Sequence, residues 1–123
     1  MRLRVLCLAA AAPLAFAAMP AQAQQMHASA DAAAETILGG EYDAAESALL
    51  TQLRANPDHP PLLINLAAVY GQTGRADEAR ALYTRVLDAD EIWMELSNGR
   101  IVRSHALARA GLDRLDSAQF ARR

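Results

Sequence analysis

The feature of this sequence that most constrains its fold is an internal repeat with a period of 34 residues. Displacing the chain against itself by this period places glycine on glycine, aspartate on aspartate and small residues on small ones. The matched pairs are Gly40 and Gly74, Asp43 and Asp77, Ala45 and Ala79, Leu53 and Leu87, Ala33 and Ala67, Ala34 and Ala68, and Leu49 and Tyr83. A period of this length is typical of stacked helix-turn-helix units, each of which buries its apolar face against a neighbour.

Glycines and aspartates predict where the helices of each unit begin and end. Gly39-Gly40 and Gly74 stand where a residue in the left-handed conformation closes one helix before the next begins. Asp43 and Asp77 then fall in the first turn of the following helix. A carboxylate there interacts favourably with the positive end of the helix dipole.

Prolines mark the boundary between the two units. Asn56-Pro57 predicts the end of one helix because the residue before proline avoids the α region, and Pro60-Pro61 predicts the start of the next. Three apolar stripes at helical spacing follow from this division, and we expect their alanines to mark close helix crossings. The stripes are Ala45, Leu49, Leu50 and Leu53; Leu63, Leu66, Ala67 and Tyr70; and Ala79, Leu82, Tyr83, Val86 and Leu87.

These residues resemble the tetratricopeptide repeat family. The resemblance is close over residues 60–90 and poorer over about 26–59, where Ala32 and Thr36 replace larger apolar residues. The later unit also departs from the family pattern, with Val86 for a typical alanine and Glu91 for the closing proline. We therefore expect residues 24–90 to form two repeats, the first of them degenerate. The matching positions in the better unit are Leu63, Leu66, Ala67, Tyr70, Gly74, Ala79, Tyr83 and Leu87.

The resemblance implies a function in protein binding without enzymatic activity. In this family the first helix of each pair lines a concave groove that grips a peptide. Carried onto this chain, the groove residues are Ile64, Asn65, Ala68 and Gln72 from the better unit, with Asp31 and Glu35 from the weaker one. Asn65 is the favoured contact because its amide both donates and accepts hydrogen bonds to a peptide backbone. The alternative is that Asn65 is an ordinary solvated helix position.

Two repeats are too few to bury a continuous core, so we expect residues 91–116 to cover the last helix. Asn98-Gly99 between two β-prone runs predicts a hairpin. Ser104 is placed to cap a final helix, and Trp93 is expected in the core. Residues 117–123 are expected to fray. The predicted fold is all-α, a short α-solenoid closed by a C-terminal β-hairpin and a capping helix; the alternative is a degenerate third repeat.

The first 23 residues have the pattern of a cleaved secretory signal. Arg2 and Arg4 precede an apolar run, and Ala21-Gln22-Ala23 supplies the small residues of a cleavage site. The alternative is an uncleaved anchor, but Pro13 interrupts the run, which is shorter than the roughly 20 residues that span a bilayer. We therefore expect export, to the periplasm if the source is a bacterium, with no stable membrane insertion after cleavage.

Charge and cysteine content restrict the partners of the mature chain. Removal of the signal leaves ten basic and 14 acidic residues, a formal net charge of −4, with no lysine and no basic cluster. Such a chain lacks the field that attracts nucleic acid or anionic membranes. Cys7 is the only cysteine and leaves with the signal, which excludes disulfides and thiolate metal sites from the product.

Candidate catalytic and metal-binding patterns are weak. His27, His59 and His105 have no second histidine three or four residues away, so we expect no metal and no cofactor. Ser104 and His105 are neighbours whose side chains diverge on a helix. The acidic residues Asp88, Asp90 and Glu91 lack the glycine and the later glutamate of a calcium loop. We predict a non-enzymatic module that binds a protein or peptide. The alternatives are a homo-oligomer that stacks copies of itself and, least favoured, a small envelope enzyme with a polar pocket.

Overall fold

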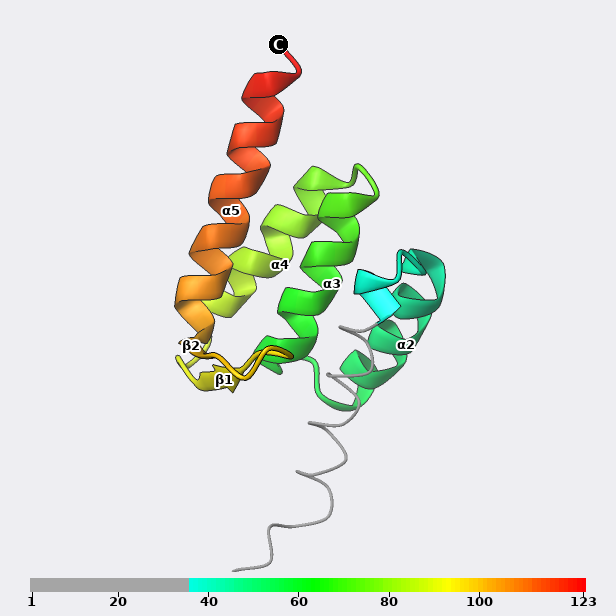
Figure 1. The fold of residues 1–123 in the computed structure, drawn as a ribbon. Coiled ribbons are helices and arrows are strands. Elements are labelled where there is room, and N and C mark those ends of the chain that lie inside the picture. Colours follow the sequence, from blue (N-terminus) through cyan, green and yellow to red (C-terminus); the bar gives the residue numbers. More distant parts are fainter. Residues whose placement is uncertain (1–35) are drawn as a thin grey trace, which may run out of the picture.

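The computed structural model describes residues 36–123 and consists of packed helices with one small hairpin. Figure 1 shows that α3 lies between α2 and α4, and that α5 packs along α4 and α3. The expected fold class is confirmed, and the C-terminal segment is a hairpin plus a helix. The elements are α2 (Tyr42–Ala55), α3 (Pro60–Gln72), α4 (Ala76–Asp88), β1 (Trp93–Glu95), β2 (Ile101–Arg103) and α5 (Ser104–Ala121).

The turns lie where the sequence places them. Gly40 and Gly74 both have a φ of 80°, in the left-handed region that favours glycine. Proline occupies the first turn of α3, and Asn56 is the C-terminal cap of α2. Asp43 and Asp77 lie in the first turns of α2 and α4, as expected.

The core consists of two clusters that share α3. The first joins α3 to α2 and contains Ala45, Leu49, Leu62, Leu66 and Val69. The second joins α3 to α4 and α5 and contains Leu63, Ile64, Ala67, Ala79, Tyr83, Val86 and Ala108. The alanines predicted at helix crossings are buried, which lets the helix axes approach closely. Leu50 departs from its predicted stripe, because its side chain is 39% exposed.

The hairpin turns Trp93 outward, so the prediction that this residue belongs to the core is wrong. Trp93 pairs with Arg103, Met94 with Val102, and Glu95 with Ile101. Side chains alternate along a strand, and Met94 takes the position that faces the core. Trp93 therefore lies on the opposite face, 66% exposed, with the Arg103 guanidinium carbon 4.8 Å from its ring centroid.

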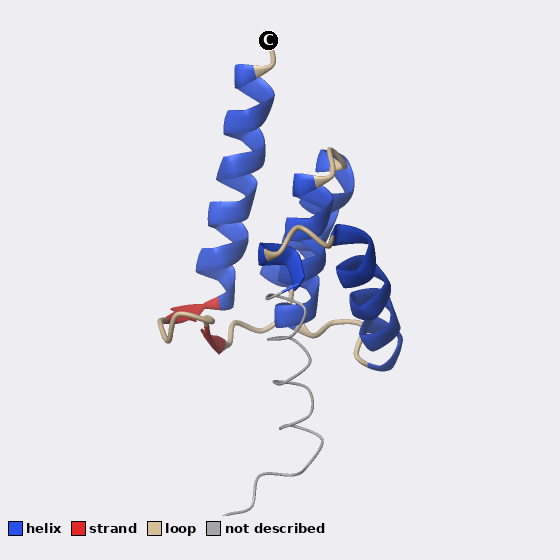
Figure 2. Ribbon diagram, turned by 45° about the vertical axis from the view of Figure 1, so that its right-hand side comes forward, coloured by secondary structure: helices blue, strands red, loops and turns tan. Residues whose placement is uncertain are grey.

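Ser104 anchors the hairpin instead of capping α5, which corrects the second expectation for this segment. It is the first residue of the helix and is fully buried. Its hydroxyl oxygen accepts a hydrogen bond from the Ile92 backbone N–H at 3.0 Å, and its own N–H donates to the Ile92 carbonyl at 2.9 Å. These bonds fix the hairpin at the base of α5, where Figure 2 shows the two strands in red.

The C-terminal end also differs from expectation, since α5 continues to Ala121 and residues 117–121 are helical. Figure 1 shows these last turns extending beyond the ends of the neighbouring helices. Phe120 lies there with 73% of its surface exposed. The predicted signal segment, residues 1–23, and the part of the predicted weaker repeat up to residue 35 lie outside the described residues.

Candidate protein-interaction surface

A hollow of about 380 Å³ opens on the side of α3 where α2 and α4 flank it. We call it the α2–α4 groove. Its floor is formed by α3, and its walls are the last turns of α2 and the second half of α4. The lining residues are Leu50, Leu53, Arg54, Pro57, Leu66, Tyr70, Leu82 and Arg85.

The interior of the α2–α4 groove is apolar. Leu66 is buried at the floor, whereas Leu53 and Leu82 are partly buried and Leu50 lies exposed at the rim. Each Å² of apolar surface that a ligand covers here contributes roughly 25 cal/mol. The groove therefore offers a binding surface for apolar side chains.

One end of the groove is closed by an ion pair between α2 and the turn before α4. The Arg75 guanidinium donates to both carboxylate oxygens of Glu46, at 3.0 and 2.5 Å, and lies 4.1 Å from the Tyr70 ring centroid. Hydrogen bonding from Arg75 lowers the pKa of Glu46 and raises that of Arg75. Burial raises the pKa of Tyr70, and the Glu46 charge adds to this effect. The pair thus stays ionised across the neutral range.

The other end is closed by Arg85 of α4. Its Nη2 donates to the Pro57 carbonyl at 2.7 Å and to Asp58 Oδ1 at 2.9 Å, both in the turn between α2 and α3. Arg75 therefore joins the start of α4 to α2, and Arg85 joins the end of α4 to the turn that follows α2.

Unused hydrogen-bond donors remain at the rim. Arg54 forms no hydrogen bond or ion pair with any of residues 36–123. Arg85 donates hydrogen bonds to residues in this range through its Nη2 atom alone. A guanidinium binds a carboxylate through two parallel hydrogen bonds. The rim is therefore suited to an anionic group next to an apolar one.

The residues predicted for a concave groove lie elsewhere. Ile64 is 9% exposed and packs with α4 and α5 side chains in the second core cluster. Asn65 and Ala68 are half-buried and Gln72 is exposed, while Asp31 and Glu35 lie outside the described residues. At about 100° per residue, Ala68 and Gln72 face away from the α3 residues that form the groove floor. The two surfaces are on opposite sides of α3.

Arg54 and Arg85 were missed by the sequence analysis, although a signal was present. Each is the basic residue in the last turn of the second helix of a unit. The leucines that line the groove all lie on the predicted apolar stripes. Helical periodicity alone does not distinguish a filled core position from the wall of an open groove.

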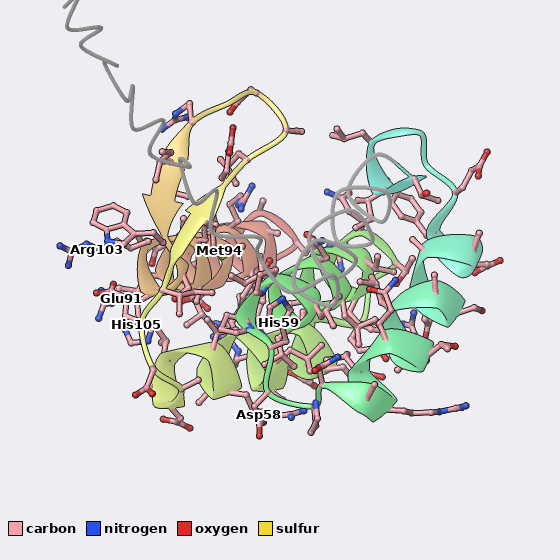
Figure 3. All side chains as sticks on the ribbon, turned by 90° about the horizontal axis from the view of Figure 1, so that it is seen from below. Asp58, His59, Glu91, Met94, Arg103 and His105 are labelled. Atoms are coloured by element: carbon pink, nitrogen blue, oxygen red, sulfur yellow. The ribbon has the colours of Figure 1, made fainter. Side chains whose placement is uncertain are left out.

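A polar cluster lies at the base of α5, where Figure 3 shows Glu91, Arg103 and His105 together. Arg103 Nη1 donates to Glu91 Oε2 at 3.1 Å, and His105 Nε2 lies 2.8 Å from the Ala89 carbonyl oxygen. These contacts join the segment before β1 to the end of β2 and the start of α5. Across residues 36–123 no group of three or more histidine, cysteine or acidic side chains is arranged to hold a metal ion. No helix in that range combines the length and apolarity needed to cross a membrane.

Comparison with known families supports the resemblance for part of the chain. Residues 36–91 match the model of the tetratricopeptide repeat family. This match covers α2, α3 and α4, including every residue of the α2–α4 groove, and ends before the hairpin. Comparison with curated proteins and with solved structures finds no match. Tetratricopeptide repeats generally mediate protein–protein interaction.

Proposed function

We propose that the chain is a non-enzymatic protein-interaction module that binds an acidic, partly apolar peptide segment in the α2–α4 groove. The observation that carries this proposal is the combination of an open apolar hollow with two arginines that retain unused donors at its rim. The family match supports protein binding in general, and the chemistry of the groove supports this class of partner.

The ligand places one or more apolar side chains against Leu53 and Leu82 and directs a carboxylate to Arg54 and Arg85. Burial of one aliphatic or aromatic side chain contributes roughly 1.5–3 kcal/mol. The arginines favour an acidic neighbour over a basic one, so they supply specificity. Arginine at the edge of an apolar pocket is typical of residues that dominate binding energies at interfaces.

The titratable groups next to the groove support binding over acid–base chemistry. The pKa of Glu46 is lowered and that of Tyr70 is raised, so both move away from neutrality. Efficient proton transfer at neutral pH requires a group whose pKa lies near the working pH. Neither residue meets this requirement.

An array of short synthetic peptides tests the proposal. Peptides that combine Leu or Phe with Asp or Glu should bind the protein, and the same peptides with Lys in place of the acids should not. Arg54→Glu should weaken binding by about tenfold or more, equivalent to about 1.4 kcal/mol. Arg109→Glu, which reverses an exposed arginine on α5, is the matched control and should bind like the parent protein.

The predicted concave face is the competing surface. An Asn65→Ala, Gln72→Ala double variant should leave binding of the acidic peptides unchanged. If that variant loses binding while Arg54→Glu retains it, the ligand occupies the other side of α3 and the α2–α4 groove proposal is wrong.

We also propose that the chain acts after export and removal of residues 1–23. The arginines before the apolar run and the Ala-Gln-Ala sequence at residues 21–23 support this. The intact mass of protein recovered from the periplasm of a bacterium expressing the full chain tests it. A product that begins at Gln24 is expected, and one that retains Met1 would contradict the proposal.

A further inference from the structure

The outer edge of β1 carries backbone groups that no described residue uses. Leu96 N–H donates to the Arg100 carbonyl at 2.8 Å, and Ser104 N–H donates to the Ile92 carbonyl at 2.9 Å. Hydrogen-bonded and non-hydrogen-bonded residue pairs alternate along an antiparallel ladder. Met94 and Val102 lie midway between the two bonded pairs just named, so they are also a hydrogen-bonded pair. The N–H and C=O groups of Trp93 and Glu95 therefore point away from β2, and within residues 36–123 they have no backbone partner.

The exposed face of the same hairpin combines apolar and charged side chains. Trp93 and Ile101 are both 66% exposed. Arg103 lies over the Trp93 ring, whereas the Glu95 carboxylate has no ion-pair partner among the described residues. An open strand edge next to exposed apolar side chains is a template for pairing with another strand.

The edge of β2 is less suited to pairing. α5 begins directly after β2 and packs against it, and Arg103 is held by Glu91 at 3.1 Å. β1 contacts mainly β2 and has no helix joined directly to either of its ends. The geometry thus leaves β1 as the available edge.

We infer that two copies of this chain associate by antiparallel pairing of their β1 strands about Met94. In this register Trp93 of each copy lies opposite Glu95 of the other, and both residues direct their unused N–H and C=O groups toward the partner. The small sheet of each copy becomes part of one continuous sheet of four strands, with two from each copy. The arrangement is two-fold symmetric, so every favourable contact occurs twice.

The charges are complementary in this register. Glu95 of one copy lies beside Trp93 of the other, within reach of the arginine that covers that ring. The exposed tryptophan gains a neighbour on the side away from β2, which removes part of its surface from water. The α2–α4 groove contains no residue of this edge, so the association is separate from the proposed peptide binding and would make the module bivalent.

Sedimentation velocity of the purified protein over a wide concentration range tests the inference. The parent protein should show a reversible monomer–dimer equilibrium. Trp93→Glu places two acidic residues opposite each other at each pairing position and should weaken association by about tenfold or more. Arg100→Glu, in the hairpin turn, is the control and should associate like the parent protein.

A mixing experiment tests the register itself. A Trp93→Lys, Glu95→Lys double variant should also associate more weakly with itself than the parent protein does, because its lysines would oppose each other. Mixed with Trp93→Glu, it should form a heterodimer, since each lysine then lies opposite a glutamate. Circular dichroism confirms that both variants are folded. The inference is overturned if the parent protein is monomeric throughout, if Trp93→Glu dimerises as strongly as the parent protein, or if the folded variants fail to associate on mixing.

Discussion

The helix crossings in the repeat region, α2 to α4, and the crossing that attaches α5 use different small residues. Within the repeats, Ala67 and Ala79 are fully buried between α3 and α4. Where α5 meets α4, a glycine takes this role: a Cβ added to Gly111 would lie 2.3 Å from Tyr83 Cζ. The last helix therefore also packs through a close approach of helix axes. The glycine that allows it, Gly111, has no counterpart in the 34-residue repeat. In α5, Gly111 allows this close approach beside Ala108, which is also fully buried in the second core cluster.

The largest contrast between the two regions is expected from leucine truncation. Leu63 is fully buried where α3 meets α4, whereas Leu112 of α5 is only partly buried. Leu63→Ala should lower the free energy of unfolding by about 2–5 kcal/mol because it removes buried surface and leaves a cavity. Leu112→Ala should cost less than half of this. Urea denaturation followed by circular dichroism measures both, and equal losses would show that α5 is packed as tightly as the repeat.

Two glycines lie on the faces that join α5 to the repeat region, and they differ in how closely a neighbouring side chain approaches them. Gly111→Ala should destabilise the protein by about 1–3 kcal/mol, since the buried Tyr83 ring must move. Gly71→Ala is the control, because its Cβ would lie 3.4 Å from Leu115 Cδ2, an ordinary contact. Alanine has the higher helix propensity, so this second change should be neutral or stabilising by up to about 1 kcal/mol. Similar destabilisation by both would contradict a close approach specific to Gly111.

The repeat region was the more predictable of the two because several independent signals agree there. Gly40, Gly74 and Pro60 fix the helix ends through backbone conformation, a local property that sequence reveals directly. In the C-terminal unit the hairpin was predicted from Asn98-Gly99, but the direction of Trp93 was not. That direction depends on which residue of the strand meets the core, and this is set by where α5 docks.

The functional surfaces were harder to predict for a related reason. Leu50 and Leu82 belong to apolar stripes, yet whether a stripe is covered depends on the spacing between α2 and α4. The polar contacts beside the groove join residues 29 and 27 positions apart, Arg75 to Glu46 and Arg85 to Asp58. Nothing local in the sequence identifies such pairs. Ser104 illustrates the same limit, since a serine before a helix has the pattern of a cap whether or not it binds a distant backbone.

A smaller effect is expected from the ion pair at the end of the α2–α4 groove. Glu46→Gln should lower the free energy of unfolding at neutral pH by about 0.5–1 kcal/mol, because the pair is partly exposed. The folded-state pKa of Glu46 lies below its usual value of 4.5, so the contribution is present above that pH and disappears as the pH falls through the lowered pKa.

Denaturation at several pH values checks this dependence. The difference between the parent protein and Glu46→Gln should shrink in acid. Asp90→Asn, at an exposed position before the hairpin, should show no such change. A difference that persists unchanged well below pH 4.5 would mean that the carboxylate charge is not its source.

The smallest effect is expected at the end of α5. Leu115 and Asp116 lie against Gly71 and Arg80. Residues 117–123 are exposed, and the Arg123 guanidinium carbon lies 5.9 Å from the Phe120 ring centroid. A chain ending at Ser117 should therefore lose less than about 0.5 kcal/mol of its free energy of unfolding. A chain ending at Gly111 also loses the packing of Leu112 and Leu115, so its free energy of unfolding should fall by several times as much. If the shorter truncation proves as harmful as the longer one, the exposed Phe120 must be covered in solution. Sedimentation of the parent protein and the two truncated proteins would then show whether a second copy covers Phe120. If all three are monomeric, the body of α5, and not its end, attaches this helix to the repeat region.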